Sequence, residues 1–237
     1  MEKFKKEIQG LINEVHSLCN DRLKSVILFG SCAKDICDET SDINLIIVIK
    51  DLEAIDLKNA TKMVQKWEKT KNPMPIFMDY NEWFCSSDVY TIEYLDIKDN
   101  YKILFGEDVV NPLVIETKNL RLQCESEIKN LLMKLRQNYI LTGNNHKAKE
   151  NLIKYSFKSS ISLFRAILRI TDLGISDDKK EIIKRISDKT EIDLPTYEKC
   201  ISFKDNKNAI KAKEFDDIIA KMITSTANVL KYVDSIE

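Results

Sequence analysis

The sequence predicts an α+β protein in two parts: a mixed sheet with helices over residues 1–112, followed by an all-α helical bundle over 113–237. Apolar runs at 25–29 and 43–49 are typical of strands that are covered on both faces. From about residue 115 onward the β pattern disappears, and apolar residues recur at helical spacing. With 5 Gly and 4 Pro in 237 residues, the chain has few turn-forming and helix-breaking residues, which favours long helices over a turn-rich all-β fold.

The first part is expected to begin with an amphipathic helix over residues 2–20, because its apolar residues fall on one face. These residues are Phe4, Ile8, Leu11, Ile12, Val15 and Leu18. The elements expected next are strands at 25–29 and 43–49, a helix over 53–70 that ends before Pro73, a strand at 76–80, a short helix at 81–84, and a strand closed by a turn at 101–112.

The second part is predicted to contain only helices. Long stripes of apolar residues over 120–139 and 152–170 end near Gly143 and Gly174, and glycine commonly ends a helix. A shorter pair at 177–188 and 194–203 and a last helix over 208–235 complete the part. This order predicts an up-and-down helical bundle.

Composition and charge argue against several classes of protein. Lys+Arg at 37 and Asp+Glu at 38 leave a formal net charge of -1, so nucleic acid is not an expected partner. No apolar stretch is long enough for a membrane span, and the N-terminus lacks the pattern of a signal peptide. The 6 cysteines form no Cys-x-x-Cys pair, which disfavours a zinc site and fits a cytoplasmic protein with reduced thiols.

Residues 26–49 carry the most informative pattern: an apolar run ends at Gly30-Ser31, and Asp42-Ile43-Asn44 enters a second apolar run. Side chains alternate along a strand, so positions 42 and 44 project the same way, about 7 Å apart. Gly30 lets the backbone approach a phosphate group without an intervening Cβ atom, and Ser31 can donate to phosphate oxygens. Lys34 adds positive charge.

This pattern resembles the signature of the polymerase-beta-like nucleotidyltransferase superfamily, in which an Asp-x-Asp follows Gly-Ser by about ten residues and holds a divalent metal against a nucleoside triphosphate. The resemblance implies that Gly30, Ser31 and Lys34 bind the nucleotide. It also implies that Asp42 and Asn44, with a third carboxylate, hold Mg²⁺ or Mn²⁺ and are the catalytic residues.

The third carboxylate has several candidates. Asp79 lies on the expected third strand, where the superfamily often supplies that group. The same residue fits equally well as the cap of the helix that starts near Asn81. Glu93 and Asp96 are further candidates, although an exposed surface is the more ordinary place for them.

Asn44 departs from the motif, because it stands where the superfamily has a second Asp. An amide oxygen can coordinate a metal, but it carries no net charge and bridges two cations poorly. The implied transfer of a nucleoside monophosphate to an acceptor hydroxyl, on a small molecule or a protein, is therefore expected to be impaired, with weakly bound metal. The alternative is a non-catalytic nucleotide-binding or protein-interaction protein on the same fold.

The two-part organisation resembles the kanamycin-nucleotidyltransferase type of arrangement, and the run Leu104 to Asp108 resembles the closing segment of such domains. The resemblance leaves three roles open for the bundle: an acceptor-binding wall, a homodimer interface, or stability alone. The sequence identifies neither the acceptor nor the preferred base.

Three other activities are disfavoured. A ribonuclease of the kind paired with minimal nucleotidyltransferases needs a His about five residues after an Arg, and Arg136 has none, since His146 follows an expected break. Phosphate binding by a Walker loop is disfavoured, because Gly30 is not followed by the second Gly and the Lys-Ser/Thr that this motif requires. Cys32 has no paired His to activate its thiol, so it is read as a small loop or core residue.

Overall fold

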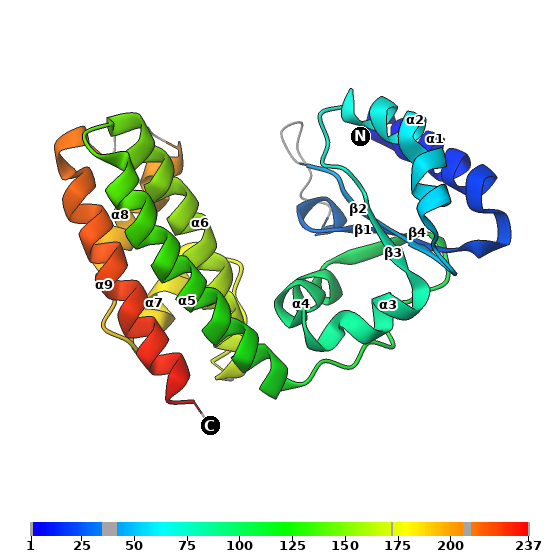
Figure 1. Cartoon of the computed structure of the whole chain (residues 1–237). Coiled ribbons are helices and arrows are strands. Elements are labelled where there is room, and N and C mark those ends of the chain that lie inside the picture. The colour runs from blue at the N-terminus through cyan, green and yellow to red at the C-terminus, as the bar shows by residue number, and fades with distance from the viewer. Residues whose placement is uncertain (1, 35–41, 172, 206–209, 237) are drawn as a thin grey trace. The chain divides into compact units, whose positions relative to one another are not determined.

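The structure is a computed structural model that describes residues 2–34, 42–171, 173–205 and 210–236. The chain divides into two compact units, Met1–Glu116 and Thr117–Glu237. The expected domain boundary at 112/113 falls in the segment that leads from the last strand to the bundle. Each unit is described by itself (Figure 1).

The first unit contains a four-stranded mixed sheet, as expected. Its strands are β1 Leu23–Phe29, β2 Asn44–Ile49, β3 Ile76–Asp79 and β4 Tyr101–Gly106. They lie in the order β3-β2-β1-β4, in which β2 and β3 are parallel and the other neighbours are antiparallel. The central pair, β1 and β2, is the one that carries the Gly-Ser and Asp-x-Asn segments at its ends.

Helices cover both faces of this sheet (Figure 1). On one face, α1 Glu2–Cys19 and α2 Ala54–Glu68 pack against every second residue of β1 and β2, including Val26, Leu45 and Ile47. On the other face, α3 Tyr80–Cys85 and α4 Thr91–Asp99 pack against Ile27, Ile46 and Val48. Burial on both sides is the physical reason for the apolar runs at 26–29 in β1 and 45–49 in β2.

Two elements differ from the sequence expectation. Helix α4 was not expected, because its buried residues are interrupted by charged ones and form no clean stripe; they are Thr91, Ile92, Tyr94 and Ile97. The last helix is expected from about residue 208; residues 208 and 209 lie outside the described part of the chain, and α9 spans Phe215–Asp234. A 3₁₀ turn, Ala212–Glu214, precedes it, in which the Glu214 carboxylate accepts a hydrogen bond from the Lys211 N–H at 3.1 Å.

The second unit is all-α in the part that the structure describes, with α5 Thr117–Thr142, α6 His146–Ile170, α7 Lys179–Ser187, α8 Leu194–Asp205 and α9. Helix α5 packs against both α6 and α9 (Figure 1). The predicted fold class, a mixed sheet followed by a helical bundle, is therefore confirmed. None of the described helices combines the length and the apolar character that crossing a membrane requires.

One cysteine contradicts the expectation of reduced thiols. Cys32 is disulfide-bonded, whereas Cys19, Cys85, Cys124 and Cys200 are free thiols. A disulfide depends on two sulfur atoms meeting in space, which spacing along the chain does not reveal. Cys32 is also buried, and its bonded sulfur offers no free thiol for nucleophilic chemistry.

Candidate functional site at the ends of strands β1 and β2

Gly30 ends strand β1 in a conformation that favours glycine. Its φ angle is +80°, in the left-handed region, and its N–H donates to the Asn100 carbonyl oxygen at 3.1 Å. A Cβ atom at this position would lie 3.4 Å from Nδ2 of Asn44, which is a tight contact. Glycine therefore allows the chain to turn here while Asn44 stands directly beside it.

The chain then makes a 3₁₀ turn, Ser31–Lys34, closed by a hydrogen bond from the Ala33 N–H to the Gly30 carbonyl oxygen at 3.0 Å. Cys32 and Ala33 are buried and fix the turn to the core. Ser31 is exposed and Lys34 is half-buried at the end of the turn. The exposed Ser31 side chain and the backbone near it are the groups that can face a phosphate from solvent.

Asp42 and Asn44 are brought next to this turn by the pairing of β1 with β2, in which Phe29 is the partner of Asn44. Ile43, between them, is 2% exposed and anchors the segment in the core. Asp42 is exposed and Asn44 half-buried, and Nδ2 of Asn44 donates to the Asp42 carbonyl oxygen at 3.5 Å. The expected partners Gly30, Asp42 and Asn44 therefore meet at one edge of the sheet.

Asn72 supports this edge, although no pattern in the sequence points to it. Its Oδ1 accepts a hydrogen bond from the Ile43 N–H at 3.1 Å, and its Nδ2 donates to Oγ1 of Thr70 at 2.8 Å. The Thr70 hydroxyl in turn donates to the Trp67 carbonyl oxygen at 2.6 Å. The backbone between Asp42 and Asn44 is thus tied to the C-terminal end of α2, which only the folded chain brings near.

Asp79 lies elsewhere. It pairs with Ile49 in the parallel β2–β3 register, five residues from Asn44 along β2, which corresponds to about 16 Å. It also faces the other way, because its neighbour Met78 packs on the side of the sheet that holds Ile46 and Val48, and side chains alternate. The structure therefore does not bring Asp79 to Asp42 and Asn44.

Asp79 instead caps α3, the second role that the sequence left open. Its carboxylate accepts from the N–H groups of Asn81 at 2.8 Å and Glu82 at 3.4 Å, and from that of Leu52 at 3.0 Å. These hydrogen bonds, above all the one from Leu52, hold the pKa of Asp79 below its ordinary value. Glu93 and Asp96, the weaker candidates, lie on α4.

The β2–β3 register begins with the pair of Ile46 and Ile76, so Asn44 has no partner on β3. Met74, two residues before β3, would lie level with Asn44 if this register continued past Pro75. Met74 is 61% exposed. A thioether is a poor ligand for hard cations such as Mg²⁺, so this position supplies no third metal ligand.

The donor set fits one magnesium ion better than two. Asp42, with triphosphate oxygens, can hold a nucleotide-associated Mg²⁺, and the amide oxygen of Asn44 can add a neutral ligand. A second, nucleophile-activating ion needs further carboxylates, and within the described residues no cluster of three His, Cys, Asp or Glu side chains could hold a metal. When bound, a nucleotide-associated metal would supply neutralisation of the triphosphate charge.

Comparisons with known proteins support the fold. The sequence matches no protein-family model and no curated protein. Among solved structures, the chain is similar to the spectinomycin adenyltransferase AAD(9) from Enterococcus faecialis, in a structure with ATP and spectinomycin, at a TM-score of 0.56 and 13% identity; the match covers 92% of this chain and 98% of that one. The chain therefore has a nucleotidyltransferase-like fold with a helical C-terminal part.

A second similarity is too distant to bear on the argument. It is to a toxin-antitoxin structure with AMP-PNP, at a TM-score of 0.29 and 15% identity, and it covers 56% of this chain and 95% of that one.

Proposed function

We propose that this protein binds a nucleoside triphosphate with Mg²⁺ at the Gly30–Asn44 edge, and that its nucleotidyl transfer to an acceptor hydroxyl is impaired. The observation that carries the proposal is the pairing of Phe29 with Asn44, which sets Gly30 beside the Asp42–Asn44 segment. In this proposal Gly30 and Ser31 receive the phosphates, Lys34 contributes positive charge, and Asp42 is the ligand of the nucleotide-associated metal.

The impairment follows from the donor set. Asn44 supplies a neutral oxygen where a charged one is expected to bridge two metals, and the residue two positions before β3, Met74, offers only a thioether. Without a second metal, the protein would lack the group that lowers the pKa of the attacking hydroxyl. Binding depends less on these positions, because the triphosphate brings its own metal ligands. Weak, metal-dependent binding with slow transfer is the expected combination.

Binding is tested by calorimetric titration of ATP, GTP, CTP and UTP in Mg²⁺ or Mn²⁺. The parent protein should bind at least one nucleotide, and Asp42→Ala should lower that affinity by about tenfold or more, because a charged metal ligand is lost. Asp21→Ala is the matched control, since Asp21 is also exposed but precedes β1 at its other end. Absence of binding at millimolar nucleotide, or equal affinity in Asp42→Ala, would contradict the proposed site.

Impairment is tested by pyrophosphate release from parent and Asn44→Asp, with Asp42→Ala as the blank and with varied acceptors. Asn44→Asp should tighten Mg²⁺ binding and raise release, and Mn²⁺ should partly rescue the parent because it accepts neutral ligands more readily. A parent rate equal to that of Asn44→Asp would mean that Asn44 is a working ligand and the enzyme is intact. Release at the blank level in both proteins, with nucleotide still bound, would identify a non-catalytic nucleotide-binding protein.

A further inference from the structure

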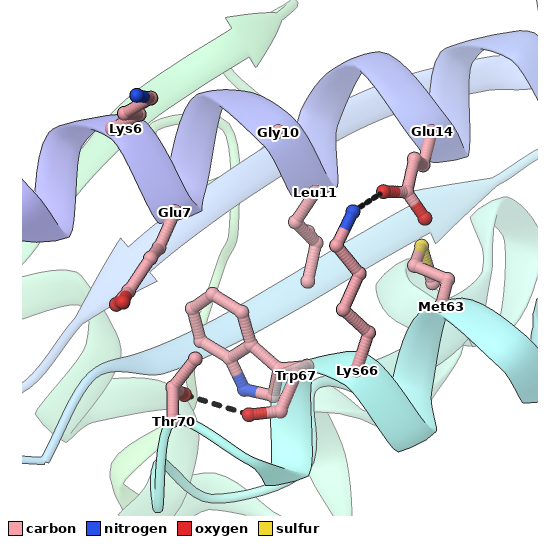
Figure 2. A pocket seen from close by; sticks show the side chains of 9 residues that line it. All are labelled: Lys6, Glu7, Gly10, Leu11, Glu14, Met63, Lys66, Trp67 and Thr70. Carbon is pink, nitrogen blue, oxygen red and sulfur yellow. Dashed lines mark hydrogen bonds and ion pairs between the residues drawn. The ribbon is translucent and has the colours of Figure 1, made fainter.

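A cavity of about 400 Å³ lies between helices α1 and α2 (Figure 2). These two helices cover the sheet face opposite α3 and α4 (Figure 1). This volume falls within the range of small-molecule sites. The walls come from both helices and from the turn after α2; they are Lys6, Glu7, Gly10, Leu11, Glu14, Met63, Lys66, Trp67 and Thr70. The cavity lies on the face of the sheet opposite the one that Asn44 shares with Ile46 and Val48, so it is separate from the proposed nucleotide site.

Gly10 leaves the room for this cavity. It lies inside helix α1, where glycine costs about 1 kcal/mol relative to alanine. A Cβ atom added at Gly10 would meet nothing within 4 Å, so the backbone is not crowded there. Neither helix geometry nor close packing requires a glycine at this position, and its effect is to leave space between the two helices.

The floor of the cavity is apolar and fixed in place. Leu11, Met63 and Trp67 are each at most 5% exposed. The Trp67 ring is held by a hydrogen bond from its Nε1–H to the Pro73 carbonyl oxygen at 2.8 Å, and its backbone carbonyl accepts from the Thr70 hydroxyl (Figure 2). The surface is therefore preformed for an apolar or aromatic group, which reduces the entropy cost of binding.

The charges around the floor are not equivalent. Lys66 and Glu14 form an ion pair across one end of the cavity, which neutralises both. At the other end, the Glu7 side chain extends from α1 toward Trp67 and Thr70, whereas the Lys6 ammonium stays beside α1 (Figure 2). Among the described residues, neither Lys6 nor Glu7 has a side-chain ion pair or hydrogen bond. The charged group that faces the apolar floor without a partner is thus the half-buried Glu7 carboxylate.

We propose that this cavity binds a small organic amine whose apolar or aromatic body rests on Leu11, Met63 and Trp67 while its ammonium group pairs with Glu7. A cation held beside an indole ring gains a further attraction from the ring. An anionic ligand of the same shape would be repelled by Glu7, and a neutral one would lack the ion pair. Amine, neutral molecule and anion therefore bind in decreasing order of affinity.

The test uses the full chain labelled with 5-fluorotryptophan, because the protein has 2 tryptophans and gives two ¹⁹F resonances, assigned with Trp67→Phe. Trp67 lines the cavity, whereas Trp83 is buried on the other face of the sheet and serves as an internal control. The probes are 2-phenylethylamine, 2-phenylethanol and phenylacetate. The Trp67 resonance should shift with the amine at the lowest concentration, while the Trp83 resonance stays in place.

Two variants separate the cavity from the charge. Gly10→Met should fill the space and abolish the shift while leaving the fold intact, and Gln9→Met, exposed on the same helix, is its control. Glu7→Gln should lower the affinity for the amine by about fivefold, to that for the neutral probe. Glu68→Gln changes an exposed residue of α2 outside the cavity and should leave all three affinities unchanged.

Several results would overturn the proposal. They are the absence of a Trp67 shift with all probes at millimolar concentration, equal affinity for the three probes in the parent, and undiminished binding in a folded Gly10→Met protein. A preference for the neutral probe or the anion would also reject the assigned chemistry.

Discussion

The two ends of strand β2 use the same kinds of side chain for different purposes. At the Asn44 end, Asp42 is exposed and Gly30 stands close beside Asn44. At the Ile49 end, three backbone N–H groups donate to the carboxylate of Asp79. A carboxylate that accepts several backbone hydrogen bonds stabilises the fold and is poorly available to a ligand, whereas an exposed one remains available. Strand register and hydrogen bonding, rather than residue type, therefore distinguish an exposed carboxylate from one that caps a helix.

The largest effect is expected from rebuilding the Asn44 end. In an Asn44→Asp background, Met74→Glu should raise pyrophosphate release by about a hundredfold, because a carboxylate level with residue 44 can act on the attacking hydroxyl. The matched control is Val89→Glu in the same background, since Val89 is 60% exposed and Met74 61%. Equal rates in the two double variants would show that residue 74 does not lie where the β2–β3 register puts it.

Removing one carboxylate at each end should give opposite results. Asp79→Ala should lower the free energy of unfolding by about 2 kcal/mol, because the helix cap and the acceptor for Leu52 are lost together, and should leave the nucleotide affinity unchanged. Asp42→Ala should weaken nucleotide binding and change the unfolding free energy by less than about 0.5 kcal/mol. Urea denaturation and calorimetry measure the two quantities. If Asp79→Ala abolished nucleotide binding in a folded protein, the division between the two ends would be wrong.

A smaller effect is expected from removing the hydrogen bond between Asn72 and the Ile43 N–H. Asn72→Ala leaves the Ile43 N–H without its acceptor, which should lower the unfolding free energy by about 1 kcal/mol and weaken nucleotide binding several-fold, since Asp42 and Asn44 flank Ile43. Asn72→Asp keeps an acceptor for this N–H and should retain more of the stability. Unchanged affinity in Asn72→Ala at intact fold would show that the hydrogen bond serves stability alone.

The smallest effect concerns pH at the Ile49 end. Because the folded protein holds the pKa of Asp79 below the ordinary value of 3.8, ionised Asp79 contributes stability above that pH, and the contribution is lost as the pH falls through the folded pKa. The side chain at position 79 cannot titrate in Asp79→Asn. As the pH is lowered from 5, the unfolding free energy of this variant should therefore fall less than that of the parent. Parallel pH profiles for the two proteins, measured by urea denaturation, would contradict this assignment.

The fold class and the proximity of Gly30 to Asp42 and Asn44 could be predicted from the sequence. The apolar runs at 26–29 and 45–49 indicate burial on both faces, and helical stripes indicate the bundle, because these patterns arise from local periodicity. The Gly-Ser and Asp-x-Asn segments flank consecutive strands, so one strand pairing is enough to bring them together. Helix α4 could not be predicted from the sequence, because charged residues interrupt its buried ones.

Other features depend on how the strands and helices pack. The direction and register of β3 against β2 place Asp79 opposite Ile49, at the end of β2 far from Asn44, and a shift along a strand cannot be read from alternation alone. Asn72 reaches Ile43, and α1 and α2 enclose a cavity at Gly10, through contacts between segments distant in sequence. Local patterns set which residues are strand, helix or turn, whereas the partners of a polar side chain depend on how those elements pack.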